Sequence, residues 1–261
     1  MQELRNVSVT RYVTALREGG SLPAVAEADD GFLYVLKFRG AGQGVKSLIA
    51  ELIGGELARH VKLKVPEIVF ANLNEAFGRT EPDEEIQDLL KASVGMNLAL
   101  HYLSRATTFD PLVTTVDAAL ASEIVFLDCL LLNVDRTFRN TNMLMWQKEL
   151  WLIDHGASLY FHHSWQDWEK KAEMPFTYLK DHVLLSAATQ LEKAGEKFRA
   201  LLDDASIEAI VSLVPDQWLV AGSPFGSAAE HRNAYSTFLK QRIRHADAII
   251  KEANNARGIL I

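Results

Sequence analysis

The sequence offers little sulfur chemistry. Its 261 residues include one cysteine, Cys129, which lies in an apolar run. A single cysteine excludes an internal disulfide and is typical of a reducing compartment, where we expect a buried thiol. A zinc site has little support, because His162 and His163 are adjacent and two neighbouring rings do not easily share one metal ion.

Long hydrophobic runs and an excess of positive charge are also missing. The apolar run 124–132 contains Asp128 and is shorter than the roughly 18 residues of a membrane span. Residues 1–8 lack the apolar core of a signal peptide. The net charge of −7 disfavours nucleic acid and anionic lipid as partners. We therefore expect a cytoplasmic protein that binds neither a membrane nor nucleic acid directly.

Two common catalytic motifs are absent from the chain. No glycine-rich loop ends in Gly-Lys-Ser or Gly-Lys-Thr, so a Walker-type nucleotide site is excluded. No Gly-x-Ser-x-Gly elbow exists, which argues against an α/β-hydrolase. The content of 48% hydrophobic and 23% charged residues is ordinary for a globular protein with a substantial core.

The order of the expected elements predicts an α+β protein with two lobes. Residues 1–100 would form a small β-rich lobe, and residues 101–261 a larger, mainly helical lobe. The apolar stretch 96–103 would connect them, while the polar residues 78–92 would form a solvated excursion with a short helix. Alternation and helical spacing of apolar residues predict strands at 7–13, 24–27, 32–38 and 68–71, a helix from about residue 48, a buried helix at 117–132, and helices at about 178–190, 194–203, 206–213 and 227–254.

Residues 133–156 hold the most informative pattern of the chain. Asp135 follows the buried helix directly, Asn140 comes five residues later, and Asp154 ends an apolar strand. Residues 143–146 and 150–153 would form a hairpin that brings Asn140 and Asp154 to neighbouring ends. Phosphotransferases need this order of groups, with one carboxylate near the acceptor hydroxyl and an amide and a carboxylate on Mg²⁺.

Two further residues of this loop have structural alternatives. Arg136 would pair with Asp135 or with a phosphate, or the two would form an ion pair on the surface. For Asn142, a second amide on the same loop, we expect a role in binding the loop backbone.

Lys37 interrupts the apolar strand 34–38. A lysine in such a strand would reach the phosphates of ATP and pair with a helical glutamate. Glu51 is the expected partner and Glu56 its competitor, because Glu51 lies nearer the loop end of the helix. The glycine-rich stretches 19–21 and 40–44 would cover phosphates through backbone N–H groups, although a plain hairpin turn is an alternative for each.

The chain resembles the HipA-like kinases and, more distantly, the phosphatidylinositol 3/4-kinases. The resemblance covers about residues 10–160 and rests on the stretches 18–23, 37–44, 57–67, 133–142 and 152–156. It implies a bilobal protein-kinase-like fold, ATP and Mg²⁺ as cofactors, and phosphorylation of serine or threonine. By resemblance, the catalytic residues are Asp135, Lys37 and Glu51, the metal ligands are Asn140 and Asp154, and the nucleotide-binding residues are Gly19, Gly20, Ser21 and Lys37.

Several points stay open at this stage. The acceptor would be a protein, a small molecule or a lipid, and a nucleotide-binding pseudokinase that acts as a binding module is the alternative to an enzyme. The resemblance implies that Ser21 is a site of inhibitory autophosphorylation. The region through which HipA toxins bind antitoxin and DNA has no counterpart here, so an antitoxin-like partner stays an open hypothesis. His155 stands where ordinary protein kinases have phenylalanine.

Overall fold

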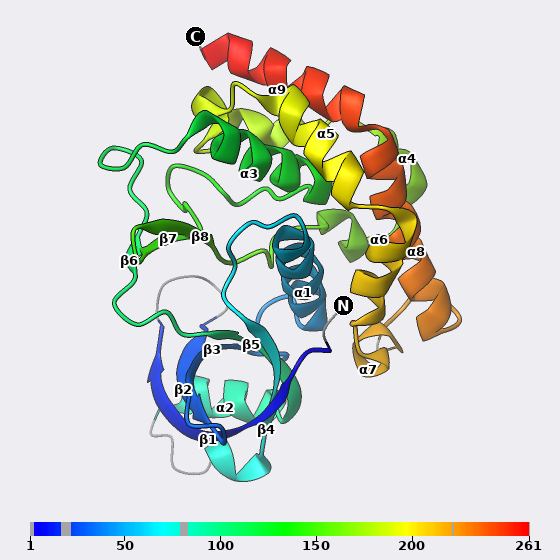
Figure 1. Cartoon of the computed structure of the whole chain (residues 1–261). Coiled ribbons are helices and arrows are strands. Elements are labelled where there is room, and N and C mark those ends of the chain that lie inside the picture. The colour runs from blue at the N-terminus through cyan, green and yellow to red at the C-terminus, as the bar shows by residue number, and fades with distance from the viewer. Residues whose placement is uncertain (1–2, 17–21, 79–82, 221, 261) are drawn as a thin grey trace.

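The N-terminal part of the protein is a closed five-stranded β-barrel (Figure 1). The structure is a computed structural model that describes residues 3–16, 22–78, 83–220 and 222–260. The strands follow the order β1-β2-β3-β5-β4, and a parallel pairing of β1 with β4 closes the barrel. Its members are β1 (Asn6–Ala15), β2 (Ala24–Ala28), β3 (Leu33–Lys37), β4 (Ile68–Leu73) and β5 (Gly95–His101).

The predicted connector at 96–103 is wrong for most of its length. These residues form β5, which pairs with β3 on one side and β4 on the other. Residues 97–100 are all buried, because both faces of this strand are covered, and such strands have continuous rather than alternating apolar sequences. A 3-10 turn, η1 (Glu75–Gly78), leads into the polar excursion, which contains the expected short helix, α2 (Glu84–Ala92).

Helix α1 (Val45–His60) lies between the barrel and the helical part (Figure 1). Residues 48–58 are buried without interruption, so this helix has neighbours on every side. Gly54 and Gly55 fit this crowding. A Cβ atom on Gly54 would lie 2.8 Å from the Cβ of His155, and one on Gly55 would lie 2.4 Å from Cδ1 of Ile68.

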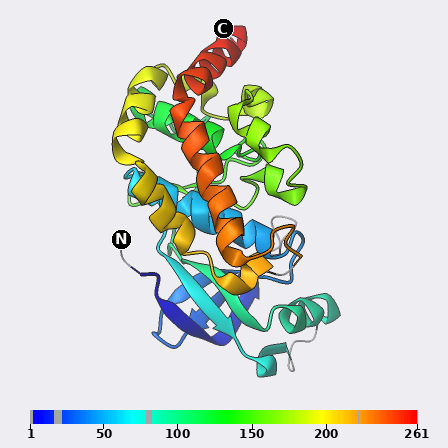
Figure 2. The same ribbon diagram turned by 90° about the vertical axis from the view of Figure 1, so that its right-hand side faces the viewer.

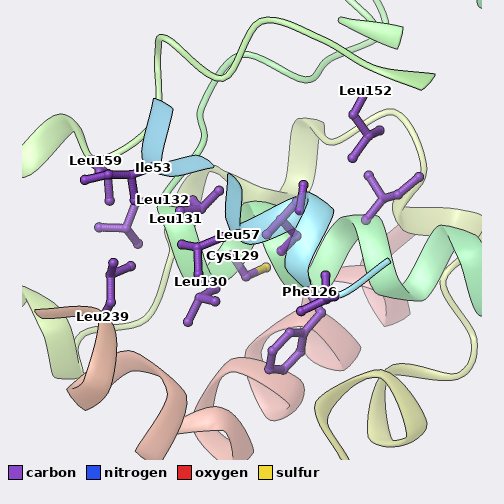
Figure 3. Packing of buried hydrophobic residues seen from close by; sticks show 14 of the residues in the cluster. Ile53, Leu57, Phe126, Cys129, Leu130, Leu131, Leu132, Leu152, Leu159 and Leu239 are labelled. Carbon is purple, nitrogen blue, oxygen red and sulfur yellow. The ribbon is translucent and has the colours of Figure 1, made fainter. Parts of the chain in front are cut away.

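Helix α3 (Ala118–Leu131) is the centre of the second part. The Asp117 carboxylate caps its N-terminus by accepting from the N–H groups of Ala119 and Leu120, which stabilises the helix start. From Ile124 to Leu131 every residue is buried. Figure 3 shows Phe126, Leu130 and Leu131 among side chains of α1 and of the later chain. The Cys129 thiol is buried as predicted.

The predicted hairpin is present after α3. It consists of β7 (Met143–Trp146) and β8 (Glu149–Leu152), and β6 (Thr107–Thr108) adds a short third strand. Gln147 and Lys148, the two turn residues, both have positive φ angles of 50° and 66°, which matches the twist of a tight hairpin.

The remaining chain is mainly helical and covers α3 (Figure 2). Two predicted helices are present near their expected places as α5 (Leu191–Leu201) and α6 (Asp204–Ser212), and the predicted 227–254 helix is divided at His245 into two. The others are η2 (Tyr160–His163), α4 (Trp168–Glu173), η3 (Thr177–Asp181), η4 (Leu185–Ala187), α7 (Asp216–Val220), α8 (Ala228–Arg244) and α9 (Ala246–Leu260).

The helix predicted at 178–190 is wrong. This segment contains the 3-10 turns η3 and η4, and His182 between them forms an isolated β-bridge with Thr137. Between the two turns, the N–H of Val183 donates to the carbonyl of Arg136 in the loop that carries Asp135, so the segment does not continue as one helix. Among the described residues, no helix combines the length and apolar character needed to span a membrane.

Candidate active site

Lys37 joins the barrel to two acidic side chains from other elements. Its Nζ atom lies 2.7 Å from Oδ1 of Asp154, which follows β8, and 3.5 Å from Oε2 of Glu51 in α1. Glu56, the alternative partner, pairs instead with Arg59 on its own helix. The side chains of Lys37 and Glu51 are 12% and 1% exposed, whereas that of Asp154 is 42% exposed. The carboxylate of Asp154 is therefore accessible from solvent, whereas Lys37 and Glu51 lie behind it in the interior.

Burial and charge act in opposite directions on this cluster. Burial would raise the pKa of Glu51, but the Lys37 ammonium and the nearby His155 ring outweigh it and hold the pKa at about 2. Burial would lower the pKa of Lys37, but Glu51 and Asp154 raise it above its ordinary value. Both groups are thus held in their charged forms.

His155 is the fourth member of the cluster and lies beside Glu51. Its ring is fully buried, and its Nδ1 atom lies 3.8 Å from Oε1 of Glu51, beyond hydrogen-bond distance. The backbone of the preceding Asp154 has a φ of 57°, in the left-handed region that aspartate tolerates better than most residues. Such backbone conformations are concentrated at functional sites. Here the turn sends Asp154 toward Lys37 while His155 packs against Gly54.

Asp135 lies on the loop between α3 and β7, where two amides hold its carboxylate. Nδ2 of Asn140 donates to Oδ2 of Asp135 at 2.8 Å, and Nδ2 of Asn142 donates to the same oxygen at 3.2 Å. Asn142 also bonds the backbone oxygen of Asp135 at 3.4 Å, so its expected role in binding loop backbone is present. Both amides use Oδ2, so neither of them occupies the other oxygen, Oδ1.

The segments that carry Asn140 and Asp154 meet at the open end of the hairpin. Met143 pairs with Leu152, and the carbonyl of Asn142 accepts the N–H of Ile153 at 3.0 Å. The donor set fits Mg²⁺, which takes one or two protein carboxylates or amide oxygens and completes its shell with phosphates and water. The carboxylate of Asp154 is accessible. Asn140 is exposed and donates from its amide nitrogen to Asp135, so its amide oxygen is free of that bond and could bind a metal ion.

The expected pairing of Arg136 is wrong. Its side chain is buried rather than on the surface, and its Nε donates to Oδ2 of Asp128 in α3 at 2.6 Å instead of binding Asp135. His182 also bonds Oδ2 of Asp128, through Nε2 at 2.9 Å. Sequence reasoning missed Asp128 and His182. The one signal was the presence of an acidic residue in an otherwise apolar helix, because a buried carboxylate needs partners.

The two glycine-rich stretches differ in what the structure describes. Gly19, Gly20 and Ser21 lie outside the described residues, so the structure gives no account of them. The 40–44 stretch is not a hairpin, because it leads from β3 into α1, with Gly44 as the N-cap. The N–H of Gly40 donates to Oγ of Ser93 and that of Arg39 to Oδ1 of Asn97, which fixes the loop against the segment that leads into β5.

Comparisons with solved structures show which proteins share this fold. The most similar structures include the Helicobacter pylori proinflammatory kinase CtkA, with 14% identity, a TM-score of 0.58 and coverage of 99% of both chains. A Golgi casein kinase aligns over 99% of this chain and 74% of its own, with 11% identity and a TM-score of 0.50. At these identities the likeness shows a shared kinase fold. A search of curated proteins gave no match.

The sequence model of one family covers most of the chain. The HipA-like kinase model matches residues 9–247, which include most of the barrel, the loop of Asp135, the hairpin and most of the helical part. The resemblance noted from the sequence motifs is thereby confirmed: the chain is a kinase and belongs to the HipA-like kinase family.

Proposed function

We propose that this kinase transfers the terminal phosphoryl group of ATP to a serine or threonine hydroxyl in the presence of Mg²⁺. The observation that carries the proposal is the meeting of Lys37, Glu51 and Asp154. These residues come from a strand, a helix and the end of a hairpin, and Lys37 and Asp154 are 117 positions apart in the chain. A lysine held by a helical glutamate beside a metal-binding aspartate is the arrangement that kinases use to hold ATP phosphates.

Each proposed residue has a separate task. Lys37 would bind the phosphates of ATP, and Glu51 would hold Lys37 in place. Asp135 would accept the hydroxyl proton on Oδ1, the oxygen that Asn140 and Asn142 leave free. Asp154 and Asn140 would hold Mg²⁺, which supplies positive charge to offset the charge that develops on the transferred group. In this arrangement Lys37 would leave Asp154 when the metal ion binds.

The two-lobed division belongs to the same proposal. Residues 1–100 would form the lobe that covers the nucleotide, and residues 101–261 the lobe that carries Asp135 and the metal ligands. The proposed boundary lies at the end of β5, which ends at His101. Gly19, Gly20 and Ser21 connect β1 to β2 in the sequence and would cover the phosphates of ATP.

Exposed aromatic residues favour a protein as the acceptor. Phe138, on the loop of Asp135, is 63% exposed, and Tyr178 in η3 is 57% exposed. The bridge between Thr137 and His182 places their segments side by side. Exposed apolar side chains in such a place are typical of a surface that contacts another macromolecule.

Mg·ATP binding and intact mass test the proposal together. Calorimetry should show Mg-dependent ATP binding by wild type and by Asp135→Ala but not by Asp154→Ala. After incubation with ATP and a protein acceptor, wild type should add phosphate to itself or to the acceptor, and Asp135→Ala should not. Lys193→Ala, on the exposed surface of α5, is a control for substitution alone.

Two outcomes would contradict the proposal. Failure of wild type to bind Mg·ATP would remove the kinase mechanism for this site. Phosphoryl transfer by Asp135→Ala at the wild-type rate would remove Asp135 as the base. Transfer to a lipid or a small molecule, with none to protein, would replace the proposed acceptor class.

A further inference from the structure

A buried polar cluster lies behind the loop of Asp135 and has no place in the mechanism above. Its centre is Asp128, whose side chain is fully buried in α3. Oδ1 of Asp128 accepts from Nδ2 of Asn133 at 2.8 Å, and Oδ2 accepts from Nε of Arg136 at 2.6 Å. His182 supplies the third partner from the distant segment between η3 and η4.

The protonation of His182 follows from its two contacts. Its Nδ1 accepts the backbone N–H of Leu184 at 3.1 Å, so this nitrogen carries no proton. The proton is therefore on Nε2, which donates to Oδ2 of Asp128 at 2.9 Å. A neutral histidine with one fixed tautomer acts as a rigid link between Leu184 and Asp128. The positive charge that balances Asp128 comes from Arg136, whose side chain is also fully buried.

Arg136 extends this link to Asp135. Besides Asp128, its guanidinium binds the carbonyl oxygen of Asn142, and the side chain of Asn142 binds the carboxylate of Asp135 at 3.2 Å. A backbone hydrogen bond joins the same two segments, because the N–H of Val183 donates to the carbonyl of Arg136 at 3.1 Å. A continuous series of hydrogen bonds thus connects His182 to the oxygen of Asp135 that does not take the proton.

We infer that Asp128 and His182 are positioning residues that hold the Asp135 loop in its reactive arrangement. Both residues are buried, so they would act on Asp135 through Arg136 and Asn142 and not by contact with nucleotide or acceptor. The segment 177–184 then sets the place of the base, and Tyr178 at its exposed end makes this segment available to an acceptor. The inference rests on the proposed role of Asp135. Buried partners that orient a catalytic group typically change activity by about 10- to 100-fold when they are removed.

Two amides at position 182 test the inference. His182→Gln carries an amide that reaches Asp128 in place of Nε2, whereas His182→Asn is one methylene shorter and does not. We expect His182→Asn to lower kcat by about 10- to 100-fold with the Kd for Mg·ATP unchanged, and His182→Gln to keep most of the wild-type kcat. His231→Asn is the matched control, since His231 is equally buried at 5% exposure but bonds the carbonyl of Leu219.

Amide hydrogen exchange provides a readout that does not depend on activity. His182→Asn should speed exchange at residues 136–140 and at Val183, and His231→Asn should not. Unchanged kcat in His182→Asn, or equal losses of kcat per folded protein in His182→Asn and His231→Asn, would overturn the inference. An inactive wild type would contradict the proposed function instead, and exchange at 136–140 would then decide alone whether His182 holds this loop.

Discussion

The molecule contains two ionic clusters that have the same types of residue but differ in how many of their buried polar atoms form hydrogen bonds. Each combines a carboxylate in a helix, a cation and a histidine: Glu51, Lys37 and His155 in one, Asp128, Arg136 and His182 in the other. Both oxygens of Asp128 accept hydrogen bonds. In the first cluster, the two oxygens of Glu51 and the two ring nitrogens of His155 have no hydrogen-bond partner among the described residues.

This difference agrees with the proposal that the Asp128 cluster is structural and the Lys37 cluster binds ATP. Buried polar groups are normally satisfied, so a group of unsatisfied atoms needs an explanation, and a functional site is one. Lys37 has a buried partner in Glu51 and an accessible one in Asp154, and the second of these can be exchanged for a ligand. The Asp128 cluster is buried and fully hydrogen-bonded, so a ligand cannot replace any of its partners. Its hydrogen bonds fix the positions of its side chains, whereas the Lys37 cluster offers a charged group to a ligand.

The largest expected loss of stability comes from breaking the Asp128 cluster. Asp128→Ala would leave Arg136 as a buried cation without a carboxylate partner and would remove the acceptor of His182. Breaking a buried ion pair on one side typically costs about 3–5 kcal/mol. Urea denaturation should show a loss of this size in the free energy of unfolding. A loss below about 1 kcal/mol would mean that the two clusters do not differ in their contribution to stability.

Lys37→Ala should lower both activity and stability. Glu51 would stay buried without its cation. ATP would lose the group that we propose to bind its phosphates, and removing one such electrostatic contact typically lowers kcat by about 10²- to 10³-fold. Single-turnover phosphoryl transfer measures this loss. Lys64→Ala is a control, because Lys64 pairs with Glu149 on the surface. Equal activities of the two variants would contradict the assignment of Lys37.

Acid should lower the free energy of unfolding by protonating the carboxylates of both clusters. The pKa of Glu51 in the folded state is about 2, below the ordinary value of 4.5, so its stabilising contribution is complete above pH 4.5 and is lost as the pH falls toward 2. For Asp128, burial would raise the pKa, but Arg136 and His182 lower it below its ordinary value, with the same sign of effect. Glu51→Gln should therefore flatten the dependence of unfolding free energy on pH between 5 and 2, as measured by urea titrations. A slope equal to that of wild type would contradict the charged state of Glu51.

The smallest effect is expected for an ion pair outside both clusters. Arg11 and Glu27 pair across β1 and β2 at 2.7 Å, with side chains that are 63% and 34% exposed. Water screens such pairs, so Arg11→Ala should change the unfolding free energy by less than about 0.5 kcal/mol. A larger loss in the same denaturation assay would mean that burial is not what distinguishes the clusters.

The sequence predicted best where a local pattern decides the structure. The strands near Val7 and Phe32, the helix after Gly44 and the hairpin before Asp154 follow from period, turn residues and apolar runs, and all are present. The segment 178–190 misled the helix prediction because its backbone bonds to residues about 45 positions earlier, at Thr137 and Arg136. No local pattern reports such a partner.

In the candidate site, too, local patterns were informative and contacts between distant segments were not. Asp135, Asn140 and Asp154 were found from one continuous stretch, because the hairpin between them is local. The meeting of Lys37 with Asp154 depends on how the barrel packs against the helical part, and the sequence assigned both residues to a nucleotide site without predicting this contact. Nothing in the spacing of Asp128 and His182, 54 positions apart, indicated that they bind each other.

The closure of the barrel gives its first strand a role in preventing self-association. Among the described residues, β1 pairs with both β2 and β4, so a chain shortened beyond Ala15 would leave these two strands with unpaired N–H and C=O groups. Such open edges recruit strands from other molecules. N-terminal truncation is therefore expected to promote self-association through β-pairing, even though every residue of the candidate site from Lys37 onward would still be present.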